Sequence, residues 1–306
     1  MKEAKRQDSM ASISDPYTVP YRRLVAVTGE PGEVELVEFY DCLGGAMWSR
    51  HHYGKSPLVR SVRCVGPTMR YLLSEGRVEL PLEGSRFPAG IAGVERDGGR
   101  VAISYVGLGG GGVGAAGSRS RAAGLDRAEA DPCGGGRRAG STVWLPERQR
   151  VLIGIDDTDT PENGATWTLA HNIARAVESD DDVYLSHTIV QLYPVRFRTK
   201  NCVGVVLEFA SNDPAGLIGR VRGLLEEYTL SDETGMAAFT GFDPAALQPF
   251  ADAVKQGEVG SEQLASVTST PGLTLHLTGR GVIGAIAAIP FFTRYEEALS
   301  LWDGPS

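Results

Sequence analysis

The stretch that begins at Val151 constrains the fold most, because short apolar runs alternate there with a helical pattern. Residues 151–155 (VLIGI) form an apolar run that is typical of a buried strand. In 164–178 the apolar side chains recur every three to four positions, as on one face of an amphipathic helix. Two further strand-like runs and a helix follow at 186–195, 202–209 and 215–228. The order β-α-β-β-α predicts a split βαβ or ferredoxin-like arrangement.

The remaining segments predict an α/β (α+β) chain made of two units. In the second unit, a helix, a strand and a last helix are expected at 244–255, at 273–278 and from Val282 onward. In the first unit, apolar runs of strand character stand between turn residues at 21–40, 59–65 and 101–106. We therefore expect a β-rich domain over 1–146 and a ferredoxin-like domain over 147–306.

A glycine-rich segment at 107–141 has almost no large apolar side chain. Such a composition buries too little surface to offset the entropy lost on ordering, which predicts a flexible insertion. The alternative is a mobile lid over a phosphate or RNA site. Its charges would come from four arginines: Arg119, Arg121, Arg137 and Arg138.

Charge divides the chain in the same way. The net charge is −8, but residues 1–150 hold 21 basic and 17 acidic groups, and residues 151–306 hold 9 and 21. The first part is therefore mildly basic and the second strongly acidic, which indicates two units with different surfaces. An acidic half binds anions only where local groups or a cation reverse its field.

Cysteine usage and the chain start indicate a cytoplasmic protein. The four cysteines contain no CxxC pair, so they predict neither a disulfide framework nor a zinc ribbon. The first ten residues lack the apolar region of a signal peptide. The sequence also has no stretch of about 18 apolar residues, the length that would span a membrane.

The first unit also carries two patterns that admit a binding role. Residues 39–55 combine cysteine, histidine and aromatic side chains, but their spacing fits no familiar metal-ligand set, so a turn that buries its aromatics is expected. Arginines interleaved with Trp48, Tyr53 and Tyr71 could bind RNA: the arginines would contact phosphates, and the aromatic rings would stack on bases. With a net charge of only +4, solvated surface charge is the favoured interpretation.

The carboxylates that follow the strand 151–155 are the first candidate site. Asp156, Asp157 and Asp159 flank Thr158 within four residues and would repel one another unless protons, cations or amides intervene. Oxygen ligands of this kind suit Mg²⁺, which uses one or two carboxylates together with substrate phosphates. The alternative is a set of caps for the next helix, but a cap needs only one such residue.

Polar groups at the entry of that helix could extend the site. Thr160, Asn163, Thr166 and Thr168 surround Gly164, where free helix amides favour a phosphate. Ordinary helix caps would look the same.

A glycine turn near the end of the chain is the second candidate. Gly279, Gly281 and Gly284 spell GxGxxG between a strand and an apolar helix, with Arg280 at the tip. Only 22 residues follow Gly284, too few for a dinucleotide-binding unit, so the turn is either a phosphate cradle or a site of close helix-to-strand packing. A third group, Arg196, Arg198 and Lys200, lies between two strands and could neutralise triphosphate charge, although exposed cations in a hairpin are common and also protect sheet edges.

Three segments together resemble the kinase-like domain of the archaeal tRNA-isoleucine agmatinylcytidine synthetase: GIDDTDTPENG (154–164), RTKNCVGVVLEF (198–209) and GRGVIGAIAAI (279–289). The full length, with YDCLGGAMWSRHHYG in its first unit, resembles methanogenesis marker protein 11, an archaeal methanogen family. The resemblance to the synthetase implies ATP as a substrate, Mg²⁺ held by Asp156, Asp157 and Asp159, and a phosphoryl-transfer step.

Two departures limit what that resemblance implies. The synthetase has paired threonines after its aspartates, one of which takes up phosphate, whereas this chain has an insertion there and Trp167 at the matching position. The OB-fold and zinc-ribbon modules that handle tRNA in the synthetase are not expected in this chain. Agmatine conjugation is therefore not carried over.

The sequence thus predicts a methanogenesis-associated, Mg²⁺-dependent ATP-binding enzyme of phosphoryl or nucleotidyl transfer type, with an unknown acceptor. Asp157 and Lys200 are the expected catalytic residues. The nucleotide is expected to contact Thr158, Thr166, Arg198, Gly279, Arg280, Gly281 and Gly284. The rival interpretation is a noncatalytic accessory or assembly factor that holds a protein or RNA partner.

Overall fold

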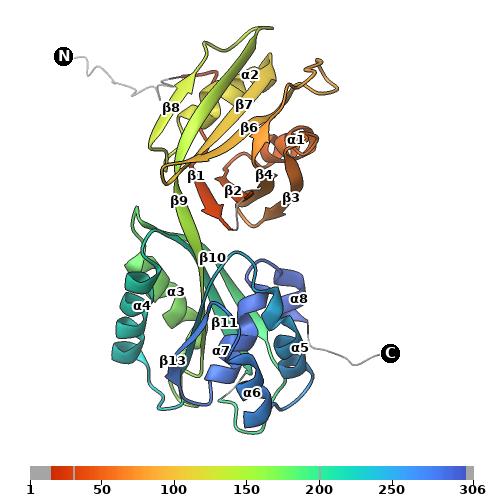
Figure 1. Ribbon diagram of the computed structural model, residues 1–306. Helices are drawn as coiled ribbons and strands as arrows, with labels where there is room; N and C mark the ends of the chain where they lie inside the picture. The colour runs from red at the N-terminus through yellow and green to blue at the C-terminus, as the bar shows by residue number, and fades with distance from the viewer. Residues whose placement is uncertain (1–14, 30–31, 200, 301–306) are drawn as a thin grey trace, which may run out of the picture.

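The computed structural model describes residues 15–29, 32–199 and 201–300, and it consists of two halves joined by one long strand (Figure 1). That strand is β9 (Arg138–Asp156), which pairs with strands of both halves. The mixed α/β architecture agrees with the predicted α+β class. None of the helices in the described ranges is long and apolar enough to cross a membrane.

The second half is built on an antiparallel sheet in the order β10-β11-β9-β12-β13. Its bounds are β10 Asp182–Gln191, β11 Val203–Ser211, β12 Gly235–Thr240 and β13 Leu273–Thr278. Up to β12, the chain order and sheet order match the predicted split βαβ arrangement, and β13 adds an edge strand. The strand β12 was not expected, because its small residues GMAAFT carry no strong strand pattern.

Helices cover both faces of this sheet (Figure 1). On one face, α3 (Thr166–Val177) and α4 (Pro214–Tyr228) pack with Val151, Ile153 and Ile155 of β9 into one apolar core. On the other face, α5 (Gln248–Gln256) and α7 (Val282–Ala288) form a second core with Leu152. The run VLIGI is apolar throughout because alternate residues serve the two cores. The short helices α6 and α8 span Ser261–Val267 and Tyr295–Leu299.

The first half is β-rich, as predicted, and its curled sheet has the order β3-β4-β2-β1-β9-β7-β6-β5. The strands are β1 Arg23–Thr28, β2 Glu33–Phe39, β3 Val59–Val65, β4 Thr68–Ser74, β5 Gly76–Arg77, β6 Ala89–Asp97 and β7 Arg100–Leu108. The segment 39–55, expected as a turn, instead contains the helix α1 (Leu43–Tyr53). This helix still buries aromatic side chains, since Tyr53 packs in the core of the first half.

The glycine-rich segment 107–141 is folded, so the expectation of a flexible insertion is wrong. It forms α2 (Gly110–Val113), a π-helical turn (Gly114–Ser118), β8 (Arg127–Ala130) and the start of β9. Small side chains here permit close packing: a Cβ added at Gly111 would lie 2.7 Å from the carbonyl oxygen of Pro88. Arg119 is fully buried and pairs with Glu38 at 2.7 Å, so it is not a charge on a lid.

The two halves meet through an apolar patch and a buried ion cluster. Valines of β1 and β2 pack against Val183, Leu185 and Ala210 of the second half. Beside them, four charged groups from both halves form one network: Glu35, Arg70, Arg150 and Glu208. All four are buried.

Candidate nucleotide and metal site

The carboxylates predicted to form the site lie where β9 ends. The backbone of Asp157 adopts a left-handed conformation with φ of 54°, which is unusual for a residue other than glycine. Its amide donates a hydrogen bond of 2.8 Å to Oδ1 of Asp156, so the two residues lie close together. A strained residue of this kind often marks a functional turn.

Asp156 and Asp157 line a cavity of about 250 Å³. The connection between β10 and β11, the helices α5 and α7 and the loop after α5 supply the rest of its wall. Most of that wall is apolar: Leu192, Val195, Phe197, Val254, Val259 and Ile283. A largely apolar wall with a few polar groups is typical of a site for a small molecule.

Burial raises the pKa of Asp156 well above its usual range, and the neighbouring charge of Asp157 raises it further. Burial also raises the pKa of Asp157, and Asp159 adds to this effect while Arg280 opposes it. Negative charge on Asp156 and Asp157 is therefore unfavourable unless a cation or a proton compensates it.

The glycine turn packs directly on these carboxylates. A Cβ added at Gly284 would collide with Oδ2 of Asp156, so only glycine leaves room for that carboxylate. At Gly281 an added Cβ would lie 2.7 Å from the carbonyl oxygen of Asp156, and at Gly279 it would meet the backbone of Glu233. Gly284 therefore belongs to the cavity wall, while Gly279 and Gly281 serve the close packing that was the alternative interpretation.

Two of the predicted cations reach the cavity. Arg280 lies 4.9 Å from the ring centroid of Phe197, and its Nε pairs with Glu233 at 3.1 Å. Arg198 also lines the cavity, and its Nη1 donates to the carbonyl oxygen of Val195 at 2.9 Å. Lys200, the second expected catalytic residue, lies outside the described residues.

The structure does not bring the predicted threonines or Asp159 to the cavity wall. The hydroxyls of Thr158 and Thr166 are 3.1 Å apart, and the amide of Thr158 donates to Thr166 at 3.2 Å. Both side chains are buried and tie the turn after β9 to the start of α3. Asp159 accepts a hydrogen bond from Thr199 at 3.4 Å.

The side chains at the cavity suit a hard divalent cation that takes only a few of its ligands from the protein. Among the described residues, no three acidic, histidine or cysteine side chains are grouped as metal ligands. Asp156 and Asp157 nevertheless place two carboxylates at the cavity, both with raised pKa values. Mg²⁺ typically takes one or two protein carboxylates and completes its shell with phosphates and water.

The apolar wall and the partner of Arg280 were not found by sequence reasoning. Phe197 lies in the basic stretch PVRFRTKN. An aromatic ring among cations was the one feature that could have indicated its place in the site. Glu233 has no motif around it and meets Arg280 only because β12 and β13 are adjacent.

Comparison with known proteins identifies two kinds of relative. Residues 152–238 match the family model of the TiaS TCKD domain, a segment that contains both cavity aspartates. The uncharacterized protein MJ0921 of Methanocaldococcus jannaschii is 37% identical over 281 residues, which cover 89% of this chain and 94% of that protein. The expected likeness to the agmatinylcytidine synthetase is thus confirmed for the domain, while that to methanogenesis marker protein 11 stays a prediction.

Solved structures of TiaS are also similar. A complex of TiaS with tRNA and ATP has 27% identity and a TM-score of 0.42, and a complex with tRNA, AMPCPP and agmatine has 26% and 0.40. Apo TiaS, described as a tRNA agmatidine synthetase, has 28% and 0.40. These matches cover 46% of this chain and 35 to 36% of the TiaS chains, so this chain spans about a third of their length.

Proposed function

We propose that this chain, which belongs to the family of the uncharacterized protein MJ0921, is a nucleotide-binding enzyme. Its cavity beside Asp156 and Asp157 binds ATP for phosphoryl or nucleotidyl transfer. The observation that carries the proposal is one cavity lined by an apolar wall, two arginines and the carboxylates of Asp156, Asp157 and Glu258. A nucleoside triphosphate has the matching parts, namely an apolar base and a chain of anionic phosphates.

Each group of the cavity has a separate task in this proposal. The apolar wall holds the base and keeps water away from it. Arg198 and Arg280 draw the phosphates to the cavity mouth and stabilise the charge that develops as a phosphorus–oxygen bond breaks. Mg²⁺ bound at Asp156 and Asp157 would neutralise phosphate charge and fix the orientation of the chain. Lys200 stays a candidate for the same electrostatic role, and Asp159 for a third metal ligand.

Several further assignments belong to the proposal. The match of residues 152–238 to the TiaS TCKD domain supports ATP as the nucleotide, since the resemblance to that domain implies ATP. The resemblance to a tRNA-modifying enzyme is also the reason to test RNA as an acceptor. The association with methanogenesis and a cytoplasmic location rest on the sequence alone. The proposed domains are 1–146 and 147–306, with the transfer site in the second.

The experiment is isothermal titration with ATP, with and without Mg²⁺, followed by identification of the product. ADP would show that the β–γ bond is cut, and AMP that the α–β bond is cut. Asp157→Asn should weaken Mg²⁺-dependent binding at least ten-fold while the melting temperature changes little. Asp232→Asn removes the same charge at an exposed position outside the cavity and should bind as the wild type does.

A noncatalytic partner-binding role is the second candidate, and one observation favours it. Thr158 and Thr166 are turned toward each other, so neither hydroxyl lies in the cavity wall to accept a phosphate. Tight ATP binding without formation of ADP or AMP, in the presence of RNA or cell extract, would support this role instead.

A further inference from the structure

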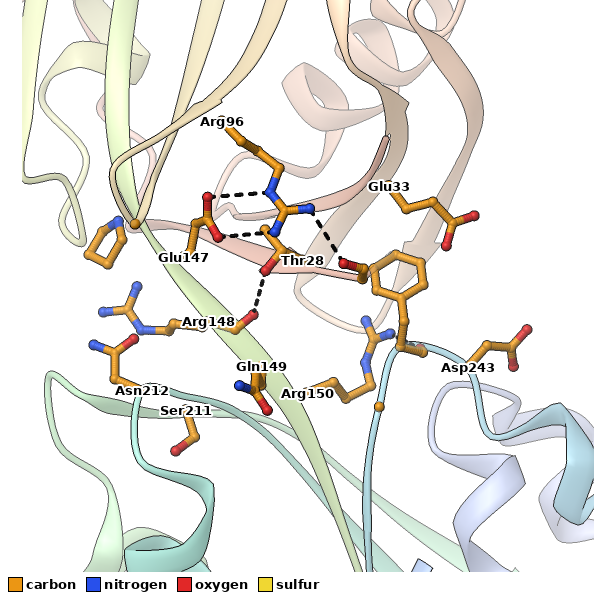
Figure 2. A pocket seen from close by; sticks show the side chains of 15 residues that line it. Thr28, Glu33, Arg96, Glu147, Arg148, Gln149, Arg150, Ser211, Asn212 and Asp243 are labelled. Atoms are coloured by element: carbon orange, nitrogen blue, oxygen red, sulfur yellow. Dashed lines mark hydrogen bonds and ion pairs between the residues drawn. The ribbon is translucent and has the colours of Figure 1, made fainter. Parts of the chain in front are cut away.

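A second cavity lies at the junction of the two halves, away from the candidate nucleotide site. It has a volume of about 870 Å³ and surrounds the middle of β9, with walls from β1, from the turn after β6 and from the ends of β11 and β12 (Figure 2). Arg148, on β9, is eight residues from Asp156, which at about 3.3 Å per residue places it roughly 26 Å away along the strand. A nucleotide at the aspartates would not reach it.

Three arginines line this cavity, and two of them form ion pairs with carboxylates. Arg96 is paired with Glu147 at 3.1 Å (Figure 2). Arg150 is paired with Glu35 and Glu208 in the buried ion cluster. These two side chains are therefore held in place by their partners. The third arginine, Arg148, differs from them.

Arg148 is a buried cation without a carboxylate partner among the described residues. Its side chain extends from β9 toward Asn212 (Figure 2). Only 5% of the residue is exposed. Nη2 donates to the carbonyl oxygen of Asp180 at 2.7 Å, but Nε and Nη1 are buried and have no hydrogen-bond partner within the described ranges. Leaving a buried charge unpaired is costly, so folding alone does not account for an arginine here.

The charges around Arg148 do not compensate it. Burial lowers the pKa of the Arg148 guanidinium, and the nearby charge of Arg23 lowers it further. Asp181, Asp126 and Asp180 oppose this effect on the pKa, but none of them makes an ion pair with Arg148 in the described part of the chain. An external anion would supply the missing charge and acceptors.

We propose that the cavity around Arg148 binds a phosphate group, either free or as part of a nucleotide or an RNA chain. A phosphate oxygen can accept from Nε or from Nη1, which lie on different edges of the guanidinium, and arginine is well suited to phosphate. The volume leaves room for a larger molecule attached to that phosphate. The site is distinct from the ATP cavity and does not depend on it.

The test compares melting temperatures in potassium phosphate and in potassium chloride of equal ionic strength. Phosphate should raise the melting temperature of the wild type by about 2 °C or more, because a ligand that binds only the folded state stabilises it. The variant Arg148→Met should show no such shift, and without phosphate it should melt at or above the wild-type temperature. Equal shifts in both proteins, or none in the wild type, would overturn the proposal.

Controls separate this site from charge effects and from the ATP cavity. Arg77→Gln removes a charge from an exposed ion pair with Glu95 and should keep the phosphate response. Asp157→Asn should keep it as well, even if ATP binding is lost. Should Arg148→Met fail to fold, titration of the wild type with phosphate in saturating Mg²⁺ and ATP decides, and an absence of binding rejects the site.

Further arms of the test identify the source of the phosphate group. The same comparison is made with AMP and with a short single-stranded RNA. An Arg148-dependent shift larger than that of inorganic phosphate assigns the site to the ligand that produces it. If only inorganic phosphate acts, the ligand is the free ion. If no arm gives an Arg148-dependent shift, the proposal is wrong.

Discussion

Arg70 and Glu208 are 138 residues apart in the chain, yet they form two parallel hydrogen bonds of 2.9 and 2.7 Å, with both side chains fully buried. Arg70 belongs to β4 of the first half and Glu208 to β11 of the second. Arg150 of β9 also pairs with Glu208, and Ser186 donates to it at 2.7 Å. The carboxylate is thus satisfied from three strands, which ties the two halves to one geometry.

Removing one partner of this pair should destabilise the whole chain. Arg70→Met leaves Glu208 buried with part of its compensation gone, and breaking a buried pair in this way costs about 3–5 kcal/mol. Urea unfolding measures the loss. Arg77→Met, which breaks an exposed pair with Glu95, is the matched control and should leave the unfolding midpoint almost unchanged. Similar losses of unfolding free energy in both variants would mean that the buried pair stabilises the fold no more than the exposed pair does.

Acid should weaken the fold through the same carboxylate. Burial by itself would raise the pKa of Glu208, but the charges of Arg70 and Arg150 outweigh it and lower the pKa to about 2. Because this value is below that of an unfolded glutamate, the stabilisation is complete above about pH 4.5 and is lost as the pH falls toward 2. The free energy of unfolding of the wild type, measured from about pH 6 down to about pH 2, should fall more steeply than that of Glu208→Gln.

Gly284→Ala should impair the nucleotide site more than the fold. The added methyl group meets Oδ2 of Asp156, which must move away from its place in the cavity wall. Overpacking of this kind costs about 1–3 kcal/mol. Mg²⁺-dependent ATP affinity, measured by titration, should fall at least ten-fold. Gly219→Ala is the control, since nothing lies within 4 Å of an added Cβ there and α4 should gain helix propensity. Unchanged ATP affinity in Gly284→Ala would argue against Asp156 as part of the site.

Arg280→Gln should weaken ATP binding by about 10- to 100-fold, the range expected for a lost charge-assisted hydrogen bond of about 1.5–3 kcal/mol. The reason is that Arg280 is one of two arginines in the cavity wall. Glu233→Gln is the informative companion, because it removes the carboxylate that pairs with Arg280 while the cation stays. That variant should bind ATP as well as the wild type or better. Weaker binding in Glu233→Gln would show that Arg280 must be held by its partner.

Local patterns in the sequence predicted much of the second half. The helix α3 and the strand β13 were found because their apolar residues follow a regular period, and Asp156 and Asp157 were found because they interrupt an apolar strand. The helix α1 was missed, since Gly44 and Gly45 lower its helix propensity and its packing against β6 and β3 leaves no signal in the local sequence.

What depends on distant partners could not be predicted. The segment 107–141 was interpreted as flexible, although its small side chains permit close packing that only the folded neighbours reveal. Arg119 gave no sign of its pairing with Glu38, 81 residues away. In the same way, nothing in the sequence distinguishes Arg148, which forms no ion pair with a described residue, from Arg150, which lies two residues later and belongs to the buried ion cluster.

The continuity of β9 has a consequence for how this chain folds and how it can be divided. A cut between residues 146 and 147 falls inside the strand, so each fragment would keep only part of the segment that pairs with β1, β7, β11 and β12. The first fragment would lose Glu147 and Arg148, which pair with β1, whereas the second would keep the residues that pair with β11 and β12. The cut would also separate Arg70 from Glu208, so the two halves are expected to unfold in one cooperative transition, and fragments split at this point should be stable only when they are produced together.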